Sequence, residues 1–281
     1  MKMRRFVIIV LVVPWLAAAQ TTIRIDSLYA PSIGMTRPFV LLLPSGYDAH
    51  QQYPILYLLH GYTGGYRDWI DRTGIENYCA DLPFIVVMPD AGNSWYVNSA
   101  TDSSQRYEDY IINDLRRHVE SMVSVDTTRR AVAGLSMGGY GALVLAFRHP
   151  DLFRFAGSLS GALDVPDDIP DWEHHSWGRS VAPNLKKTFG ARPGPFWQHH
   201  DLFRLFRTVP ADSLPYCYMA AGTHDGFVRF LPAARALADS LRAYGAAYEY
   251  HETPGRHSWK FWDREIQPLL KQLADRFAQP N

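Results

Sequence analysis

Hydrophobic residues fall into short continuous runs, separated by longer stretches in which apolar and polar residues mix. Runs of this kind are typical of strands that are buried on both faces of a parallel sheet. We therefore predict strands at residues 39–44, 54–60, 84–89, 130–136, 155–161, 216–222 and 246–252. The helical spacing of apolar residues between these runs predicts helices at residues 107–123, 138–149, 231–244 and 261–277.

Strands that alternate with helices predict an α/β fold with a mostly parallel, doubly wound sheet and helices on both faces. Residues 21–30 alternate between polar and apolar types, which predicts an antiparallel edge strand beside the run at 39–44. Residues 163–215 have no regular period and carry clusters of Asp, Trp, His and Pro. A structureless stretch of this length is typical of a functional loop, so we expect a lid-like insertion there.

The N-terminal segment has basic residues first, then an apolar run, and then three small residues at positions 17–19. This three-part pattern predicts a secretory signal peptide at residues 1–19, cleaved before Gln20. The apolar run is shorter than the ~20 residues that span a bilayer, so we expect no stable membrane insertion after cleavage. Residues 20–281 then form a single domain, exported to the periplasm or to the extracellular space.

Composition narrows the range of partners. The chain has 28 basic and 28 acidic residues, so no strong field favours nucleic acid, and we expect no such partner. Cys79 and Cys217 lie in apolar segments. We expect two buried free thiols, although export would permit a disulfide. The sequence leaves the oligomeric state open.

A glycine-rich turn surrounds one serine in the stretch RRAVAGLSMGGYGAL. Gly134, Ser136 and Gly138 form a G-x-S-x-G motif between a predicted strand and a predicted helix. This context is typical of a nucleophile elbow, a strained turn that exposes the serine hydroxyl at the N-terminus of the next helix. The Met137 N–H would then face a developing oxyanion. The alternative is a glycine-rich turn with an incidental serine, and the flanking strand and helix favour the elbow.

A serine nucleophile needs a base, and folds with this elbow place the triad in the order Ser, acid, His. His257 lies in a Gly/Pro loop between the last predicted strand and the last helix. Asp225 follows the strand at 216–222, at the sheet edge where catalytic groups gather. We predict that Asp225 orients His257, which activates Ser136. An ordinary Asp-Gly turn is the alternative for Asp225.

The loop after the strand at 54–60 is expected to supply the second oxyanion donor, the backbone N–H of Tyr62. His60 is expected to form structural hydrogen bonds beneath this loop. No H-E-x-x-H motif is present, so we expect no metal site. Acyl transfer, the reaction that a serine, a histidine and an aspartate in this order would carry out, also needs no cofactor.

Aromatic residues near the predicted catalytic edge are candidates for binding a substrate ring. Trp95 and Tyr96 follow the strand at 84–89, and Trp69, Trp172 and Trp177 are candidates for the same wall. Such rings stack on an aromatic acyl group or on a sugar. Ordinary packing in the core is the alternative for each of them.

Several stretches together resemble the esterase D group of α/β-hydrolases, over residues 37–277: YLLHGYTGGYRDW, FIVVMPD, SWYVNS, YEDYIINDL, AVAGLSMGGYGAL, SLSGAL, AGTHD and GRHSWKFW. The group includes feruloyl and acetyl-xylan esterases, tributyrin-type esterases, S-formylglutathione hydrolases and mycolyltransferases. The resemblance implies an α/β-hydrolase fold with the catalytic residues named above. Leu135 and Tyr140 stand where S-formylglutathione hydrolases typically carry His, and the elbow is closer to the tributyrin and feruloyl branches.

These features predict an exported serine carboxylesterase that hydrolyses feruloyl or acetyl esters of carbohydrate, or small acyl esters, through an acyl-enzyme. One alternative is an acyltransferase that uses a sugar hydroxyl in place of water. Another is a non-catalytic carbohydrate-binding protein on the same fold. Peptidase activity is less expected, because the chain has no propeller-length region and no acidic anchor for a peptide terminus.

Overall fold

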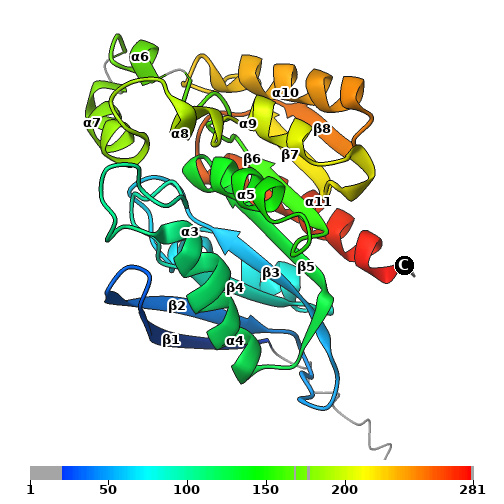
Figure 1. The fold of residues 1–281 in the computed structure, drawn as a ribbon. Helices are drawn as coiled ribbons and strands as arrows, with labels where there is room; N and C mark the ends of the chain where they lie inside the picture. The colour runs from blue at the N-terminus through cyan, green and yellow to red at the C-terminus, as the bar shows by residue number, and fades with distance from the viewer. Residues whose placement is uncertain (1–20, 168, 176–177, 280–281) are drawn as a thin grey trace, which may run out of the picture.

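The computed structural model describes residues 21–167, 169–175 and 178–279. Within these residues one 8-stranded sheet has the order β1-β2-β4-β3-β5-β6-β7-β8 (Figure 1). The strands are β1 (Thr22–Ala30), β2 (Met35–Leu43), β3 (Tyr53–Leu59), β4 (Ile85–Pro89), β5 (Val125–Leu135), β6 (Phe155–Leu159), β7 (Tyr216–Gly222) and β8 (Tyr248–Thr253).

The sheet is mostly parallel, as predicted. β1 pairs antiparallel with β2, and β2 pairs antiparallel with β4. All strands from β4 to β8 along the sheet pair parallel with their neighbours. The predicted strands and the antiparallel edge strand are therefore confirmed, although β5 begins five residues earlier, at Val125 rather than Arg130.

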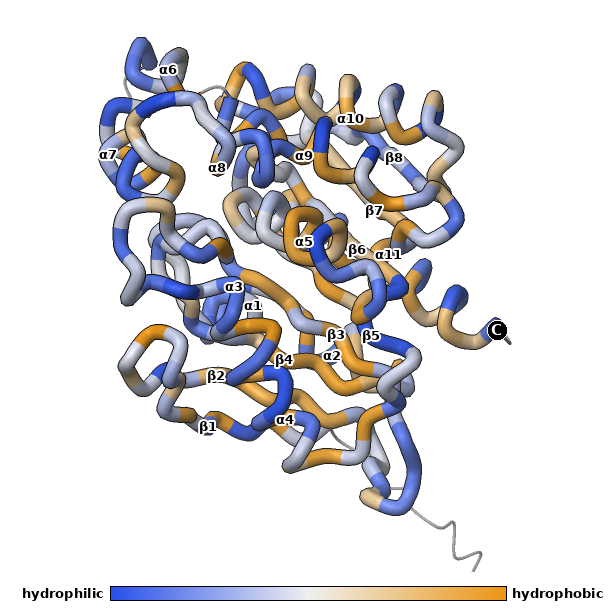
Figure 2. The backbone as a smooth tube through the Cα atoms, viewed as in Figure 1, coloured by the Kyte–Doolittle hydropathy of each residue, from blue (hydrophilic) through white to orange (hydrophobic). Residues whose placement is uncertain are grey.

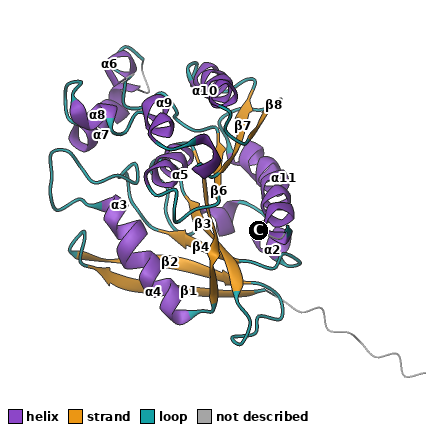
Figure 3. Cartoon of the chain, turned by 45° about the vertical axis from the view of Figure 1, so that its right-hand side comes forward, coloured by secondary structure: helices purple, strands orange, loops and turns teal. Residues whose placement is uncertain are grey.

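Helices cover both faces of the sheet (Figure 3). One face carries α3 (Tyr107–Asp109), the π-helix η1 (Tyr110–Leu115), α4 (Arg116–Met122), α5 (Met137–Arg148) and α10 (Phe230–Tyr244). The other carries α1 (Asp68–Arg72), α2 (Ile75–Cys79) and α11 (Trp259–Ala278). Each face buries its own apolar cluster, and the hydrophobic strands run between the two clusters (Figure 2). The predicted helices are confirmed.

The insertion at 163–215 is not structureless, which corrects the prediction from its irregular pattern. It folds into α6 (Ile169–Trp172), α7 (Gly178–Phe189), α8 (Pro195–Gln198), α9 (Leu202–Leu205), and the 3₁₀ helices η2 (Phe206–Thr208) and η3 (Ala211–Ser213). Most of these helices are too short to show a helical period in the sequence. Figure 1 places α6 to α8 together, beside the N-terminal end of α5.

The predicted signal peptide at residues 1–19 lies outside the described residues. In the part of the chain that the structure describes, no helix is both long and apolar enough to cross a membrane. Cys79 and Cys217 are buried free thiols, as expected. Burial raises the pKa of each thiol to about 12, which makes both poor nucleophiles.

Candidate active site

The serine of the G-x-S-x-G motif sits on a sharp turn between β5 and α5. Ser136 has φ 54° and ψ −117°, a backbone conformation that non-glycine residues rarely adopt. A larger residue on either side would clash with neighbouring backbone. A Cβ at Gly134 would lie 2.5 Å from the Gly138 carbonyl oxygen, and one at Gly138 would lie 2.6 Å from the His60 carbonyl oxygen. The glycines therefore allow the tight turn that exposes the hydroxyl.

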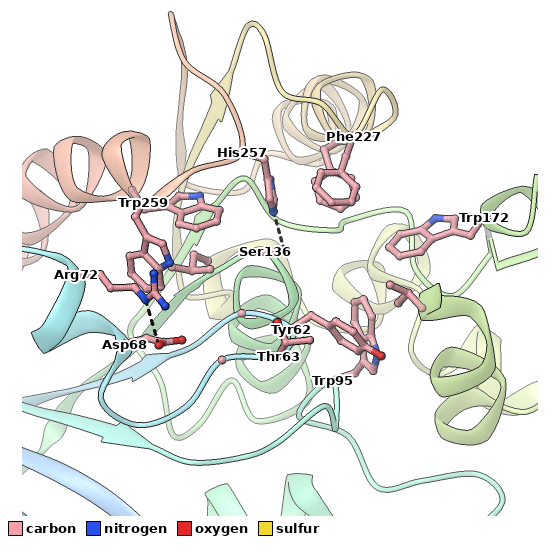
Figure 4. Close-up of a pocket in the computed structure, with 16 residues that line it drawn as sticks. Tyr62, Thr63, Asp68, Arg72, Trp95, Ser136, Trp172, Phe227, His257 and Trp259 are labelled. Atoms are coloured by element: carbon pink, nitrogen blue, oxygen red, sulfur yellow. Dashed lines mark hydrogen bonds and ion pairs between the residues drawn. The ribbon is translucent and has the colours of Figure 1, made fainter. Parts of the chain in front are cut away.

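The structure brings Ser136, His257 and Asp225 into one hydrogen-bonded line. His257 Nε2 lies 3.0 Å from Ser136 Oγ (Figure 4), and His257 Nδ1 lies 2.9 Å from Asp225 Oδ2. Each residue follows the carboxyl end of a strand: β5, β8 and β7 respectively. Carboxyl ends of parallel strands meet at one edge of the sheet, which is why residues so distant in sequence converge. With Nδ1–H donated to the carboxylate, Nε2 is left to accept the serine proton.

Aromatic rings enclose this line. Phe227, Phe230 and Trp262 have ring centroids 4.4, 5.4 and 4.9 Å from that of His257. The Asp225 side chain is only 2% exposed, and its Oδ1 accepts the Phe227 backbone N–H at 2.9 Å. The carboxylate is thus fixed by one bond to the backbone and one to the imidazole. This fixed pair holds the histidine in a single orientation.

The first residue of α5 and the β3–α1 loop border the serine on two sides. Met137 is the first residue of α5, so its N–H has no acceptor within the helix. The β3–α1 loop approaches from the other side, and a Cβ at Gly61 would lie 3.6 Å from the Ser136 Cβ. Tyr62 lines the cavity above the serine. Both residues expected to donate to an oxyanion therefore belong to segments beside the serine, and their role as donors stays a prediction.

His60 forms the structural hydrogen bonds that were expected of it. Its Nε2 accepts the Ala91 N–H at 3.0 Å, so the proton is on Nδ1, which donates to the Gly61 carbonyl at 2.8 Å. Burial lowers the pKa of His60 and keeps the ring neutral.

A cavity of about 350 Å³ opens over the serine hydroxyl. One end is apolar and is lined by Trp95, Trp172, Val181, Phe227 and Phe230. The other end is lined by Asp68, Arg72 and Trp259 (Figure 4). The reactive hydroxyl thus lies between an aromatic end and a polar end. An ester with one apolar part and one polar part could therefore place its carbonyl carbon at Ser136, with one part in each end of the cavity.

A comparison with protein-family models gives a match over most of the chain. Residues 30–273 match the family described as "Putative esterase", which is most of the chain. The chain belongs to this esterase family. It is accordingly a carboxylic ester hydrolase.

Curated relatives of the esterase cover most of its length. An acetyl esterase of Caldicellulosiruptor saccharolyticus is 28% identical over 230 residues, 78% of this chain and 82% of the relative. The diacylglycerol acyltransferase/mycolyltransferase Ag85B of Mycobacterium intracellulare is 26% identical over 274 residues, 89% of this chain and 82% of the relative.

Solved structures establish the α/β-hydrolase fold. The fluorophosphonate-binding serine hydrolase FphF of Staphylococcus aureus matches with a TM-score of 0.77 at 23% identity, covering 91% of this chain and 99% of that one. A ferulic acid esterase matches with a TM-score of 0.71 at 22% identity, covering 91% of this chain and 98% of that one.

Of the aromatic residues singled out in the sequence, the structure brings Trp95 and Trp172 to the esterase's cavity. Tyr96 and Trp69 do not line it. Tyr96 is fully buried and donates its hydroxyl to the His60 carbonyl at 2.9 Å. Trp69 is 1% exposed and donates its indole N–H to the Leu59 carbonyl. Both side chains are buried behind the residues that line the cavity and support its walls. Trp177 lies outside the described residues.

Sequence reasoning missed the residue that holds Trp95 in place. Asn184 of α7 accepts the Trp95 indole N–H at 2.8 Å and donates its own amide to the Asn93 carbonyl at 3.0 Å. Trp95 has φ 58°, so this ring is carried on an unusual backbone turn. A lone Asn in an irregular segment gives no sequence signal. Only the packing of α7 against the β4–α3 loop reveals it.

Within residues 21–167, 169–175 and 178–279, no group of three or more His, Cys, Asp or Glu side chains is arranged to hold a metal ion.

Proposed function

We propose that the protein is an exported serine carboxylesterase that hydrolyses acyl esters of carbohydrates or of small alcohols. The observation that carries this proposal is the hydrogen-bonded line from Ser136 Oγ through His257 to Asp225, with distances of 3.0 and 2.9 Å. A neutral serine is a poor nucleophile unless a base takes its proton as it attacks.

In the first half-reaction, Ser136 Oγ bonds to the ester carbonyl carbon while its proton passes to His257 Nε2. The carbonyl oxygen becomes an oxyanion, which the N–H groups of Tyr62 and Met137 stabilise. The C–O bond to the alcohol then breaks, and the imidazolium gives its proton to the leaving oxygen. Water attacks the acyl-enzyme through the same base and releases the acid and the free serine.

The apolar end of the cavity is suited to the acyl group. Trp95 lies 6.0 Å from Trp172 between ring centroids, and Phe227 stacks on Phe230 at 4.9 Å. Burying an acyl chain or an aromatic ring against these side chains is favourable because it removes apolar surface from water. Feruloyl and acetyl groups are the acyl classes that the relatives and structural neighbours suggest.

Export rests on the N-terminal pattern of basic, apolar and small residues. An exported esterase would meet acylated carbohydrates outside the cell rather than cytosolic thioesters. The insertion at 163–215 contributes Trp172 and Val181 to the cavity, and we assign it a part in substrate selection.

Acyl transfer to a sugar hydroxyl is the second candidate. It is favoured by the likeness to a diacylglycerol acyltransferase/mycolyltransferase, at 26% identity. The two activities share the acyl-enzyme and differ only in the acceptor that attacks it. Hydrolysis remains the first proposal, because the chain belongs to the esterase family and an acetyl esterase is among its relatives.

The test is hydrolysis of p-nitrophenyl acetate, butyrate and octanoate, methyl ferulate and acetylated xylan, with wild type beside Ser136→Ala. We expect a loss of roughly 10⁶-fold in turnover for Ser136→Ala. Ser121→Ala, which removes an exposed hydroxyl on α4, is the matched control and keeps full activity.

If wild type cleaves no ester in the panel, or if Ser136→Ala retains activity, the proposal is wrong. Sugar acceptors added to the same assays detect acyl transfer. A sugar ester that forms faster than the free acid would favour the acyltransferase.

A further inference from the structure

The loop that carries Tyr62 contains a strained residue. Thr63 has φ 63°, in the left-handed region that a β-branched residue rarely adopts. It lines the same cavity as Tyr62, and Figure 4 shows both residues on one side of Ser136. Strain of this kind persists only where surrounding groups hold it. We propose that the Asn93 side chain holds it, which makes Asn93 a positioning residue for the oxyanion donor. The proposal rests on the proposed esterase function and adds a residue to its site.

Residues 61–64 form a tight turn. The Gly64 N–H donates to the Gly61 carbonyl at 3.0 Å, which places Tyr62 and Thr63 at the two central positions. Thr63 has a positive φ and Tyr62 does not, which is the pattern of a type II turn. The second central position of this turn usually carries glycine or asparagine, whereas threonine suits a type I turn. The two turns differ mainly by a rotation of the peptide between the central residues.

The Asn93 side chain fixes that peptide in the orientation of the type II turn. Its Oδ1 accepts the Thr63 N–H at 2.7 Å. The Thr63 N–H belongs to the central peptide, so a rotation into the type I form would turn it away from Asn93. The same rotation would change ψ of Tyr62. The bond to Asn93 therefore opposes a rearrangement directly beside the proposed donor.

Asn93 is itself held in place by the insertion. Its backbone carbonyl accepts the amide of Asn184 at 3.0 Å, and Asn184 also accepts the Trp95 indole N–H. Asn93 thus serves two neighbours with different atoms. Its side chain holds the loop of Tyr62, and its carbonyl helps to hold the acyl wall. A substitution of the side chain removes the first contact and leaves the second.

The test is steady-state kinetics of Asn93→Ala with p-nitrophenyl acetate and methyl ferulate. We expect kcat to fall about tenfold for both esters, because a donor that is less well placed stabilises the transition state less. KM should change less than about twofold. The ratio of the two kcat values should stay as in wild type, since the Asn93 carbonyl still holds Asn184. A fall confined to KM, or a fall for one ester only, overturns the proposal.

Thr63→Gly gives a readout that a merely structural role of Asn93 would not move. Glycine adopts a positive φ without strain, so the turn depends less on Asn93 to keep its form. The factor by which Asn93→Ala lowers kcat is measured in the wild-type and in the Thr63→Gly background. We expect about tenfold in the first background and no more than about threefold in the second. Equal factors in the two backgrounds overturn the proposal.

Asn98→Ala is the matched control. Asn98 Oδ1 accepts the Asp109 N–H at 3.2 Å, the same kind of bond from the same β4–α3 loop, but Asn98 does not line the cavity. We expect this variant to keep the wild-type kcat. Circular dichroism checks that all variants are folded. An equal fall in Asn98→Ala would show that the loss of any such bond in this loop lowers turnover, which overturns the specific role of Asn93.

Failure of the esterase itself is recognised separately. Hydrogen exchange of the backbone amides at residues 61–65 reports how firmly the loop is held, without any ester. We expect faster exchange there in Asn93→Ala than in wild type or in Asn98→Ala. If wild type cleaves neither ester and this difference is present, the proposed function fails while the hold of Asn93 on the loop stands. Equal exchange in wild type and Asn93→Ala overturns that hold, whatever the kinetics show.

Discussion

His60 donates its Nδ1–H to the carbonyl of Gly61 at 2.8 Å. The Gly61 carbonyl and the Tyr62 N–H belong to one planar peptide and point in opposite directions. Holding the carbonyl beneath the loop therefore turns the N–H outward, toward the side on which Gly61 approaches Ser136. This bond relates a buried histidine to the proposed oxyanion donor without any contact between His60 and the substrate.

The first prediction follows from that bond. His60→Ala removes one of the two hydrogen bonds to the Gly61 carbonyl, which also accepts the Gly64 N–H at 3.0 Å, so the Tyr62 N–H is held less firmly toward the oxyanion. We expect kcat for p-nitrophenyl acetate to fall on the order of 10- to 100-fold, somewhat less than the loss of a whole donor. KM should change less than twofold, because the ground-state ester gains little from this donor. Steady-state kinetics on folded protein measure both. A fall confined to KM contradicts the positioning role.

The second prediction concerns Asn184 and the shape of the acyl end. Asn184→Ala leaves the buried indole N–H of Trp95 without its acceptor, which costs about 1–3 kcal/mol of stability. It also frees the Trp95 ring. We expect the preference for methyl ferulate over p-nitrophenyl acetate to fall several-fold, because the larger acyl group uses more of this wall.

Asn184→Asp keeps an acceptor oxygen for the Trp95 indole and should recover most of the preference. Asn77→Ala, at an exposed position on α2, is the control and should change neither stability nor preference. Equal losses for both esters in Asn184→Ala would show that Trp95 does not select the acyl group.

The hydrogen-bonded line of Ser136, His257 and Asp225 and the order of strands and helices could be predicted from sequence because their signals are local. Gly134, Ser136 and Gly138 lie within one turn, and Asp225 and His257 each follow a strand that hydrophobicity marks. The walls of the cavity could not be assigned in this way. Trp95 faces the cavity and its neighbour Tyr96 faces the core, because consecutive left-handed residues, with φ 58° and 60°, direct the two side chains differently.

The third prediction concerns acid stability and His200 in the insertion. Burial lowers the pKa of His200 to about 4, from an ordinary value of 6.5. The folded protein therefore resists binding a proton that the unfolded chain takes up below pH 6.5. The contribution of His200 to the free energy of unfolding is fully present above pH 6.5 and decreases as the pH falls from 6.5 toward 4. The loss from this one group approaches about 3 kcal/mol.

His200→Gln removes this titration but keeps a side-chain donor for the Phe196 carbonyl, which His200 Nδ1 contacts at 2.7 Å. Urea unfolding at pH 7, 5.5 and 4 should show a shallower loss of stability for the variant than for wild type. His50→Gln, at an exposed position, should keep the wild-type slope. Parallel slopes for wild type and His200→Gln would mean that folding does not lower the pKa of His200, which would contradict the prediction.

The last prediction tests whether close packing of the backbone requires glycine beside Ser136. Gly138→Ala would place a Cβ 2.6 Å from the His60 carbonyl oxygen and 2.7 Å from that of Leu59, both backbone atoms of the β3 end and its loop. These atoms cannot rotate away as a side chain does, so β3 and α5 must separate. Overpacking of this kind costs typically 1–3 kcal/mol, and here it also moves the Tyr62 loop away from Ser136.

We therefore expect Gly138→Ala to lower both the melting temperature and kcat, the latter by at least about tenfold. Gly194→Ala is the matched control, since a Cβ there meets no atom within 4 Å and its φ of −177° suits any residue. Thermal melts and p-nitrophenyl acetate kinetics on both variants decide the point. If Gly138→Ala melts and turns over like Gly194→Ala, α5 is free to shift without disturbing the serine, and the tight packing is not what positions the nucleophile.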